Sequence, residues 1–272
     1  MNRKRVLTVG FIVFGIVFLV ATVMFVVNLV KERKEKNTIE NQQEILNEYK
    51  EENIMTDEAK VDENSSLAML PEYKKLYEEN SDIIGWLKIE DTKIDYPVMQ
   101  TMDDEEYYIY RDFYKNDNQN GTLFMDTDSM VGVGKQELNY EEGNVPSTNL
   151  IIYGHTMKTG EMFGDLDLYD KEDYGMAHKI IYFDTLYEKR EYELISVFYS
   201  QVFYKHQDVF KYYKFFQANT QEEFDNWYNN IKEMSIYDTG VTAQFGDEFI
   251  TLSCCAYHVE DGRFVVVGKR IK

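Results

Sequence analysis

The only two cysteines of the chain are neighbours, Cys254 and Cys255. A disulfide between adjacent residues would be strained and would close almost no loop, so the pair predicts free thiols. In the strand-like run Phe249–Cys255, side chains alternate between two faces. Cys254 falls on the apolar face, and Cys255 falls on a small, polar face with Thr251 and Ser253, which is typical of a cleft wall. Cys255 is therefore the candidate nucleophile, and Cys254 is expected in the core.

A thiol with an ordinary pKa of about 8.5 needs a base or a cation nearby to attack at neutral pH. His155 ends the apolar run Leu150–His155, at a strand exit where active-site residues often lie. The other three histidines stand in polar or ambiguous surroundings that predict solvated surface positions: His178, His206 and His258. His258 is the second candidate, because it follows Cys255 closely.

Arg263 opens another strand-like run, Arg263–Ile271. A guanidinium at a strand end can donate two hydrogen bonds to a carbonyl oxygen that becomes an oxyanion. The alternative is a surface ion pair in an acidic protein. The Cys, the His and the Arg are each a weak signal alone, whereas their order along the chain is more specific.

Three motifs in that order resemble the sortases, whose pattern is a TLxTC strand end, an upstream His and a following Arg. The motifs are TLSCC, ending at Cys255, IIYGHT upstream and GRFVVVGKR downstream. The resemblance covers residues 70–272, and the run Ile83–Gln100 and a helical segment at Thr220–Ser235 are similar to the class B group. Cys254 stands where the family usually has Thr, but alignment on the last residue still makes Cys255 the nucleophile.

The resemblance implies a mainly β fold with helices, a single eight-stranded sortase-type β-barrel. It implies that Cys255 attacks the backbone carbonyl after Thr in the C-terminal sorting signal (NPxTN- or PxTG-like) of a secreted protein. The thioester would then pass to an amine of a peptidoglycan precursor or cross-bridge. His155 would act as acid and base, and Arg263 would stabilise the oxyanion. Ser253 and Tyr153 would contact the peptide, and the chemistry requires no metal or cofactor.

Local patterns predict the elements that would position these residues. Helices are expected at Pro71–Glu79, around Glu161–Leu168 and at Thr220–Ser235, the last with Thr220 as its N-cap. Eight strands are expected at Ile84–Ile89, Lys93–Val98, Thr122–Asp126, Leu150–Tyr153, Ile180–Phe183, Glu191–Tyr199, Phe249–Cys255 and Arg263–Ile271.

The N-terminal region predicts a membrane anchor. Residues 6–30 carry no charge, and as a helix they would extend about 37 Å, enough to cross a hydrocarbon core of about 30 Å. A cleaved signal peptide would have a shorter apolar run and a small-residue cleavage site. We expect a cytoplasmic tail at 1–5, a transmembrane anchor at 6–30, a stalk at 31–69 and a catalytic domain at 70–272. The bases before the span favour a single-pass protein with an extracellular domain.

The charge of the chain argues against a nucleic-acid partner. There are 49 acidic and 29 basic residues, and such a surface repels phosphates. The acidic run Asp103–Glu106 lacks the spacing of an EF-hand, so it predicts a solvated turn rather than a calcium site.

Three other functions remain open at this point. A papain-like protease would use the same Cys and His chemistry, but it usually has its Cys before its His. A pilin-polymerising sortase would use a lysine amine as acceptor. A membrane-tethered binding module would carry an incidental, buried thiol.

Overall fold

The computed structural model describes residues 3–55, 69–132 and 146–272. The chain divides into two compact units, Met1–Glu44 and Ile45–Lys272. Each unit is considered separately below.

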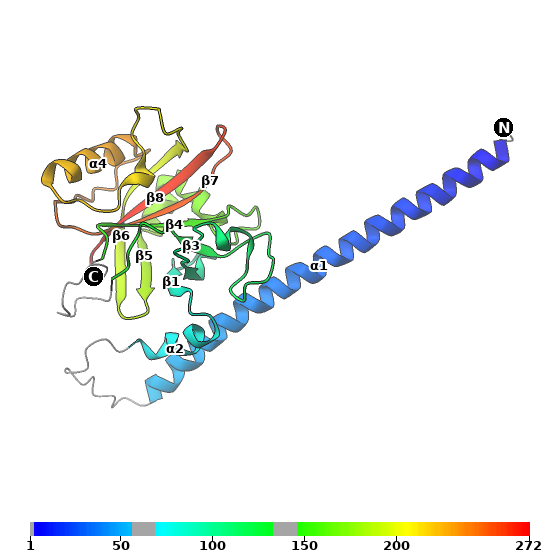
Figure 1. Ribbon diagram of the computed structural model, residues 1–272, viewed down its shortest axis with the longest axis horizontal. Helices are drawn as coiled ribbons and strands as arrows, with labels where there is room; N and C mark the ends of the chain where they lie inside the picture. Colours follow the sequence, from blue (N-terminus) through cyan, green and yellow to red (C-terminus); the bar gives the residue numbers. More distant parts are fainter. Residues whose placement is uncertain (1–2, 56–68, 133–145) are drawn as a thin grey trace. The chain divides into compact units, whose positions relative to one another are not determined.

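The first unit consists of helix α1 (Arg3–Met55), which continues into the second unit (Figure 1). The large apolar side chains between Phe11 and Val30 are exposed. By length and composition, the helix segment Phe11–Glu48 is a candidate membrane span. The uncharged run predicted at residues 6–30 lies in this helix.

The second unit contains a closed barrel of eight strands within the described residues (Figure 1). Around the barrel the strands follow the order β1-β2-β3-β4-β7-β8-β6-β5. Their bounds are β1 Ile83–Lys88, β2 Asp95–Met99, β3 Leu123–Met125, β4 Asn149–Gly154, β5 Ile180–Thr185, β6 Lys189–Gln201, β7 Phe249–Cys255 and β8 Gly262–Arg270. All eight predicted strands are confirmed, with ends that differ by at most a few residues.

Two of the strand pairs are parallel, β2 with β3 and β4 with β7. The other pairs are antiparallel, including the β1–β5 pair that closes the barrel. Because β4 and β7 run in the same direction, their C-terminal ends lie at the same edge of the barrel. The residues that follow both strands therefore meet there.

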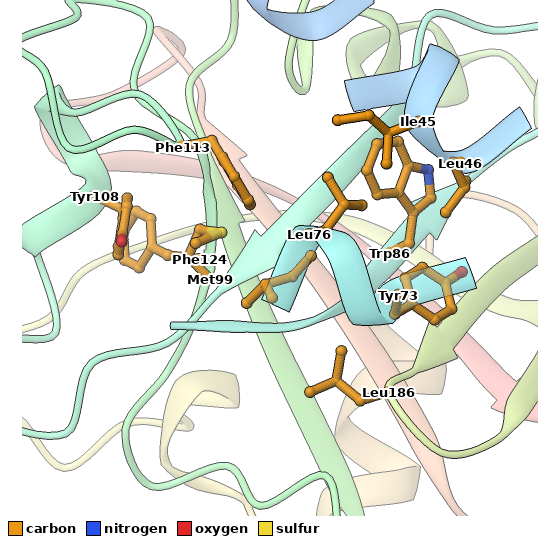
Figure 2. Close-up of a cluster of buried hydrophobic side chains, with 11 residues drawn as sticks. Ile45, Leu46, Tyr73, Leu76, Trp86, Met99, Tyr108, Phe113, Phe124 and Leu186 are labelled. Atoms are coloured by element: carbon orange, nitrogen blue, oxygen red, sulfur yellow. The ribbon is translucent and has the colours of Figure 1, made fainter. Parts of the chain in front are cut away.

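One hydrophobic cluster of the second unit lies around helix α2 (Pro71–Glu79) and strand β1 (Figure 2). It contains Leu76, Trp86 and, from the last part of α1, Ile45 and Leu46. Ile45 and Leu46 are 5% and 4% exposed, although they fall in the segment that the sequence suggests as a stalk. The hydrophobic core therefore includes residues upstream of position 70.

Helix α4 (Gln221–Met234) packs against β6 through a second cluster. Thr220 and Glu223 form the capping box that satisfies the first backbone donors of the helix. The face of α4 that carries Phe224, Trp227 and Ile231 is buried.

The helix predicted at Glu161–Leu168 is wrong in type and extent. The structure has a 3-10 helix, η2 (Gly164–Asp170), followed by a short helix α3 (Glu172–Ala177). Met162 has a positive φ of 52°, in the left-handed region that a right-handed helix excludes. A regular α-helix therefore cannot run through residue 162.

Candidate active site

Three strand ends bring Cys255, His155 and Arg263 to one edge of the barrel. The parallel β4–β7 ladder ends with the pair Gly154 and Cys254, so His155 and Cys255 are the next residues of each chain segment. In the antiparallel β7–β8 ladder, Cys255 is paired directly with Arg263. The strand topology thus places a thiol, an imidazole and a guanidinium together.

The two thiols have different surroundings. Cys255 is partly exposed, whereas Cys254 is buried, as its place on the apolar face predicts. The Cys254 sulfur lies 3.8 Å from both Asp167 Oδ1 and the Phe264 carbonyl oxygen. Burial raises the pKa of Cys254, and the negative charge of Asp167 adds to this effect. Cys254 is therefore held as a neutral thiol, and Cys255 is the accessible one.

The imidazole of His155 is held by a short 3-10 helix, η1 (Tyr107–Tyr110). His155 Nε2 lies 2.8 Å from the carbonyl oxygen of Ile109, and its ring centroid lies 5.4 Å from that of Tyr110. A carbonyl oxygen only accepts, so Nε2 must carry the hydrogen of this bond. In the neutral ring Nδ1 is then the acceptor, available to exchange a proton.

Arg263 is half-buried at the start of β8. Its Nη1 donates to the carbonyl oxygens of Gly262 at 3.0 Å and Asp261 at 3.3 Å. Within the described residues the guanidinium forms no ion pair, so a surface salt bridge does not account for it. A guanidinium without a carboxylate partner can offer donors to an oxyanion.

Ser253 and Tyr153 are adjacent across the β4–β7 ladder, and each has an internal hydrogen-bond partner. The Ser253 hydroxyl lies 2.7 Å from that of Tyr212, and Tyr153 donates to Asp126 Oδ2 at 2.9 Å. Ser253 is 1% exposed. The polar face of β7, predicted as an open cleft wall, is thus covered as far as Ser253, because Tyr212 packs over it.

The other three histidines contact tyrosines. His178 stacks on Tyr174 with ring centroids 4.0 Å apart. His206 and His258 are exposed, beside Tyr204 and Tyr199 respectively. These positions agree with the surface interpretation of His206 and His258, whereas His178 is partly buried.

Sequence reasoning did not identify the groups that hold the candidate residues. Ile109 acts through its backbone carbonyl, and because every residue has one, the residue type gives no sign of this contact. Tyr212 and Asp167 come from segments distant in the chain from β7. Thr156 donates a hydrogen bond to the Cys255 carbonyl oxygen at 2.8 Å. Its position directly after His155 in the IIYGHT motif is the one available sequence signal.

Comparisons with known proteins identify the family. No family model matches the chain. Sortase B of Listeria monocytogenes is 30% identical over 203 residues, which cover 74% of this chain and 74% of that protein. Sortase B of Staphylococcus aureus is 28% identical over 278 residues, which cover 100% of this chain and 99% of that protein.

Solved structures agree with these relatives. A Staphylococcus aureus sortase B–substrate complex superposes with a TM-score of 0.70 at 25% identity, covering 89% of this chain and 99% of that one. Sortase B of Bacillus anthracis superposes with a TM-score of 0.67 at 27% identity, covering 90% and 99%. The sequence relatives and the shared eight-stranded barrel show that this chain belongs to the sortase B family of cysteine transpeptidases.

Proposed function

We propose that this enzyme cleaves the C-terminal sorting signal of a secreted protein after Thr and joins the protein to a cell-wall amine. The observation that carries the proposal is the arrangement at the strand ends. Cys255 is a partly exposed free thiol that is paired with Arg263 across β7 and β8, and its strand β7 lies next to β4, whose last residue precedes His155. A relative, sortase B of Staphylococcus aureus, has been solved in complex with a substrate. A signal of the NPxTN or PxTG type is the substrate class we infer.

In the first half-reaction the Cys255 thiol gives its proton to Nδ1 of His155, and its sulfur attacks the backbone carbonyl carbon of the Thr residue in the sorting signal. The oxygen becomes an oxyanion, and the Arg263 guanidinium donates hydrogen bonds to it. The C–N bond then breaks, and the leaving amine takes a proton from His155, through Nδ1. The products are a thioester on Cys255 and the released C-terminal peptide.

In the second half-reaction an amine of a peptidoglycan precursor or cross-bridge attacks the thioester carbon. His155 accepts the proton of that amine, and the C–S bond breaks to restore the Cys255 thiolate. The new amide bond joins the secreted protein to the cell wall. Atoms and protons balance over the two steps without a cofactor.

The substrate-side roles of Ser253 and Tyr153 stay predictions. Both hydroxyls are oriented by internal partners, Tyr212 and Asp126, so any effect on the peptide would act through a preformed groove wall. Ser253→Ala and Tyr153→Phe should then raise KM with little change in kcat. A fall in kcat at constant KM would contradict this assignment.

The proposal places the enzyme at the cell membrane as a single-pass protein. The exposed apolar part of α1 supports an anchor in the membrane, and the acidic catalytic unit would lie outside the cell. That location gives the enzyme access to secreted proteins and to cell-wall amines.

A peptide assay with the full chain in detergent micelles tests the proposed function. Fluorogenic peptides of the NPxTN and PxTG types are incubated with and without an added amine, beside Cys255→Ala and Cys254→Ala. The proposal predicts an amine-dependent ligation product that is lost with Cys255→Ala and largely kept with Cys254→Ala. Hydrolysis unaffected by any amine would indicate a protease, and preference for a lysine side chain would indicate pilin polymerisation. No turnover together with slow alkylation of Cys255 would indicate a binding module.

A further inference from the structure

The backbone pairing between β4 and β7 stops one residue before the candidate catalytic pair. Its last pair is Gly154 with Cys254, and the next residues, His155 and Cys255, lie outside the ladder. Beyond this point a side-chain hydrogen bond, rather than a backbone pair, links the two segments. The Thr156 hydroxyl donates to the Cys255 carbonyl oxygen at 2.8 Å.

The turn that carries Thr156 is itself fixed by several bonds. Phe163 N donates to the His155 carbonyl oxygen at 2.9 Å, and Thr156 forms a β-bridge with Met162. Met162 N donates to the Tyr96 hydroxyl at 3.2 Å. The backbone of His155 is thus hydrogen-bonded to Phe163, and the next residue, Thr156, is hydrogen-bonded to Cys255 at the end of β7.

The Thr156 side chain also affects the second thiol. It lowers the pKa of Cys254 against the larger raising effect of burial, and the Cys254 sulfur lies 3.8 Å from both Asp167 Oδ1 and the Phe264 carbonyl oxygen. Thr156 therefore acts on both residues of the adjacent-cysteine pair, at the end of the β4–β7 backbone ladder.

We propose that Thr156 is a positioning residue for the transpeptidase reaction, holding the main chain of Cys255 beside His155. The proposal rests on the proposed roles of those two residues. Thr156 contacts no reacting atom; it acts through the Cys255 carbonyl and through its place in the chain directly after His155. A misplacement of about 1 Å between reacting groups lowers rates by about a hundredfold. Loss of the hydrogen bond from Thr156 to Cys255 should therefore have a large effect on catalysis.

Replacement of the hydroxyl alone tests this role in the full chain in detergent micelles. Thr156→Val keeps the branched shape and removes the donor, whereas Thr156→Ser keeps the donor. We expect kcat for Thr156→Val to fall about tenfold or more, with KM changed by less than about twofold. Thr156→Ser should restore most of kcat. Thr159→Val, an exposed threonine of the same turn, is the matched control and should behave as the parent enzyme.

A second measurement needs no peptide substrate: the rate of Cys255 alkylation by iodoacetamide at pH 7. It should change severalfold in Thr156→Val, in the same direction as in His155→Ala, and remain near the parent value in Thr156→Ser. If the parent enzyme turns over no sorting peptide, the proposed function fails while the alkylation rates still decide the role of Thr156. Parent-like kcat and alkylation in Thr156→Val would overturn the inference. Equal losses in the Val and Ser variants with a lowered Tm would overturn it as well.

Discussion

At the scale of residues, the two adjacent cysteines of β7 differ in how far their thiols are exposed. Cys254 is covered by η2 residues and by β8, and burial raises its pKa. Cys255, one residue further, is partly exposed. The difference follows from the position of Cys255 at the last residue of β7, because Ser253 on the same strand face is buried. If Cys255 is the nucleophile, as proposed, the buried neutral thiol of Cys254 would not compete with it.

The carboxyl group of Asp126 predicts a pH-dependent stability. Burial raises the pKa of Asp126 to about 6 from its ordinary 3.8, and the charge of Glu105 contributes, against hydrogen bonds from Asp128 N and Tyr153. Between about pH 4 and pH 6 the folded chain keeps a proton that the unfolded chain has lost. The free energy of unfolding should therefore fall as pH rises through this window, by an amount on the order of 2 kcal/mol.

Thermal unfolding of the full chain, followed by tryptophan fluorescence from about pH 4 to pH 7, measures this dependence. Asp126→Asn should flatten the curve in that window. Asp128→Asn, at an exposed neighbour, should keep the slope of the parent. An unchanged slope in Asp126→Asn would show that another group titrates there.

The candidate residues that the structure brings to one barrel edge were predictable from the sequence, and the residues that support them were not. Cys255, His155 and Arg263 have side chains with distinctive chemistry and stand at the ends of apolar runs. The Ile109 carbonyl that holds His155 belongs to an ordinary residue, placed by a fold that the sequence does not reveal residue by residue. The partners of Ser253 and Tyr153 are likewise long-range contacts.

At the scale of elements, the sequence predicted correctly those features that depend on residues close together in the chain. The capping box of α4 and the buried face of Phe224, Trp227 and Ile231 are both local patterns. The helix predicted around Glu161–Leu168 was wrong, because Met162 has a positive φ and the observed 3-10 helix starts only at Gly164. Strand ends shifted, since pairing partners decide where a ladder stops.

The cap of α4 gives a prediction at this scale. Thr220→Ala removes the side chain that accepts from Glu223 N, so we expect the free energy of unfolding to fall by about 1 kcal/mol. Chemical denaturation of the full chain in micelles measures the change. Asn229→Ala, at an exposed position inside the helix, should leave stability equal or slightly higher. A Thr220→Ala variant as stable as the parent would mean that tertiary packing alone holds this end of α4.

At the scale of the whole molecule, the chain combines an apolar helix with a closed barrel. The uncharged run predicted the helix, and the resemblance to the sortases predicted the barrel, which the Sortase B relatives support. The extent of the barrel unit was harder to predict. Ile45 and Leu46 belong to a polar-looking helical segment, and only their burial against the α2 cluster reveals their role.

Membrane attachment is the prediction that belongs to this scale. The full chain should remain with the membrane fraction after an alkaline wash, and a variant that lacks residues 6–30 should be soluble. External protease added to intact cells should digest the catalytic unit if that unit lies outside. Release of the full chain by the wash, or complete protection from the protease, would contradict the proposed location.

The central claim is that Cys255 carries the substrate as a thioester. The most direct measurement mixes the full chain in micelles with an NPxTN-type peptide, quenches in acid and maps the acylated residue by mass spectrometry. The account predicts a hydroxylamine-labile adduct on Cys255, still formed in Cys254→Ala and absent in Cys255→Ala. An adduct on Cys254, or peptide turnover that persists in Cys255→Ala, would contradict it.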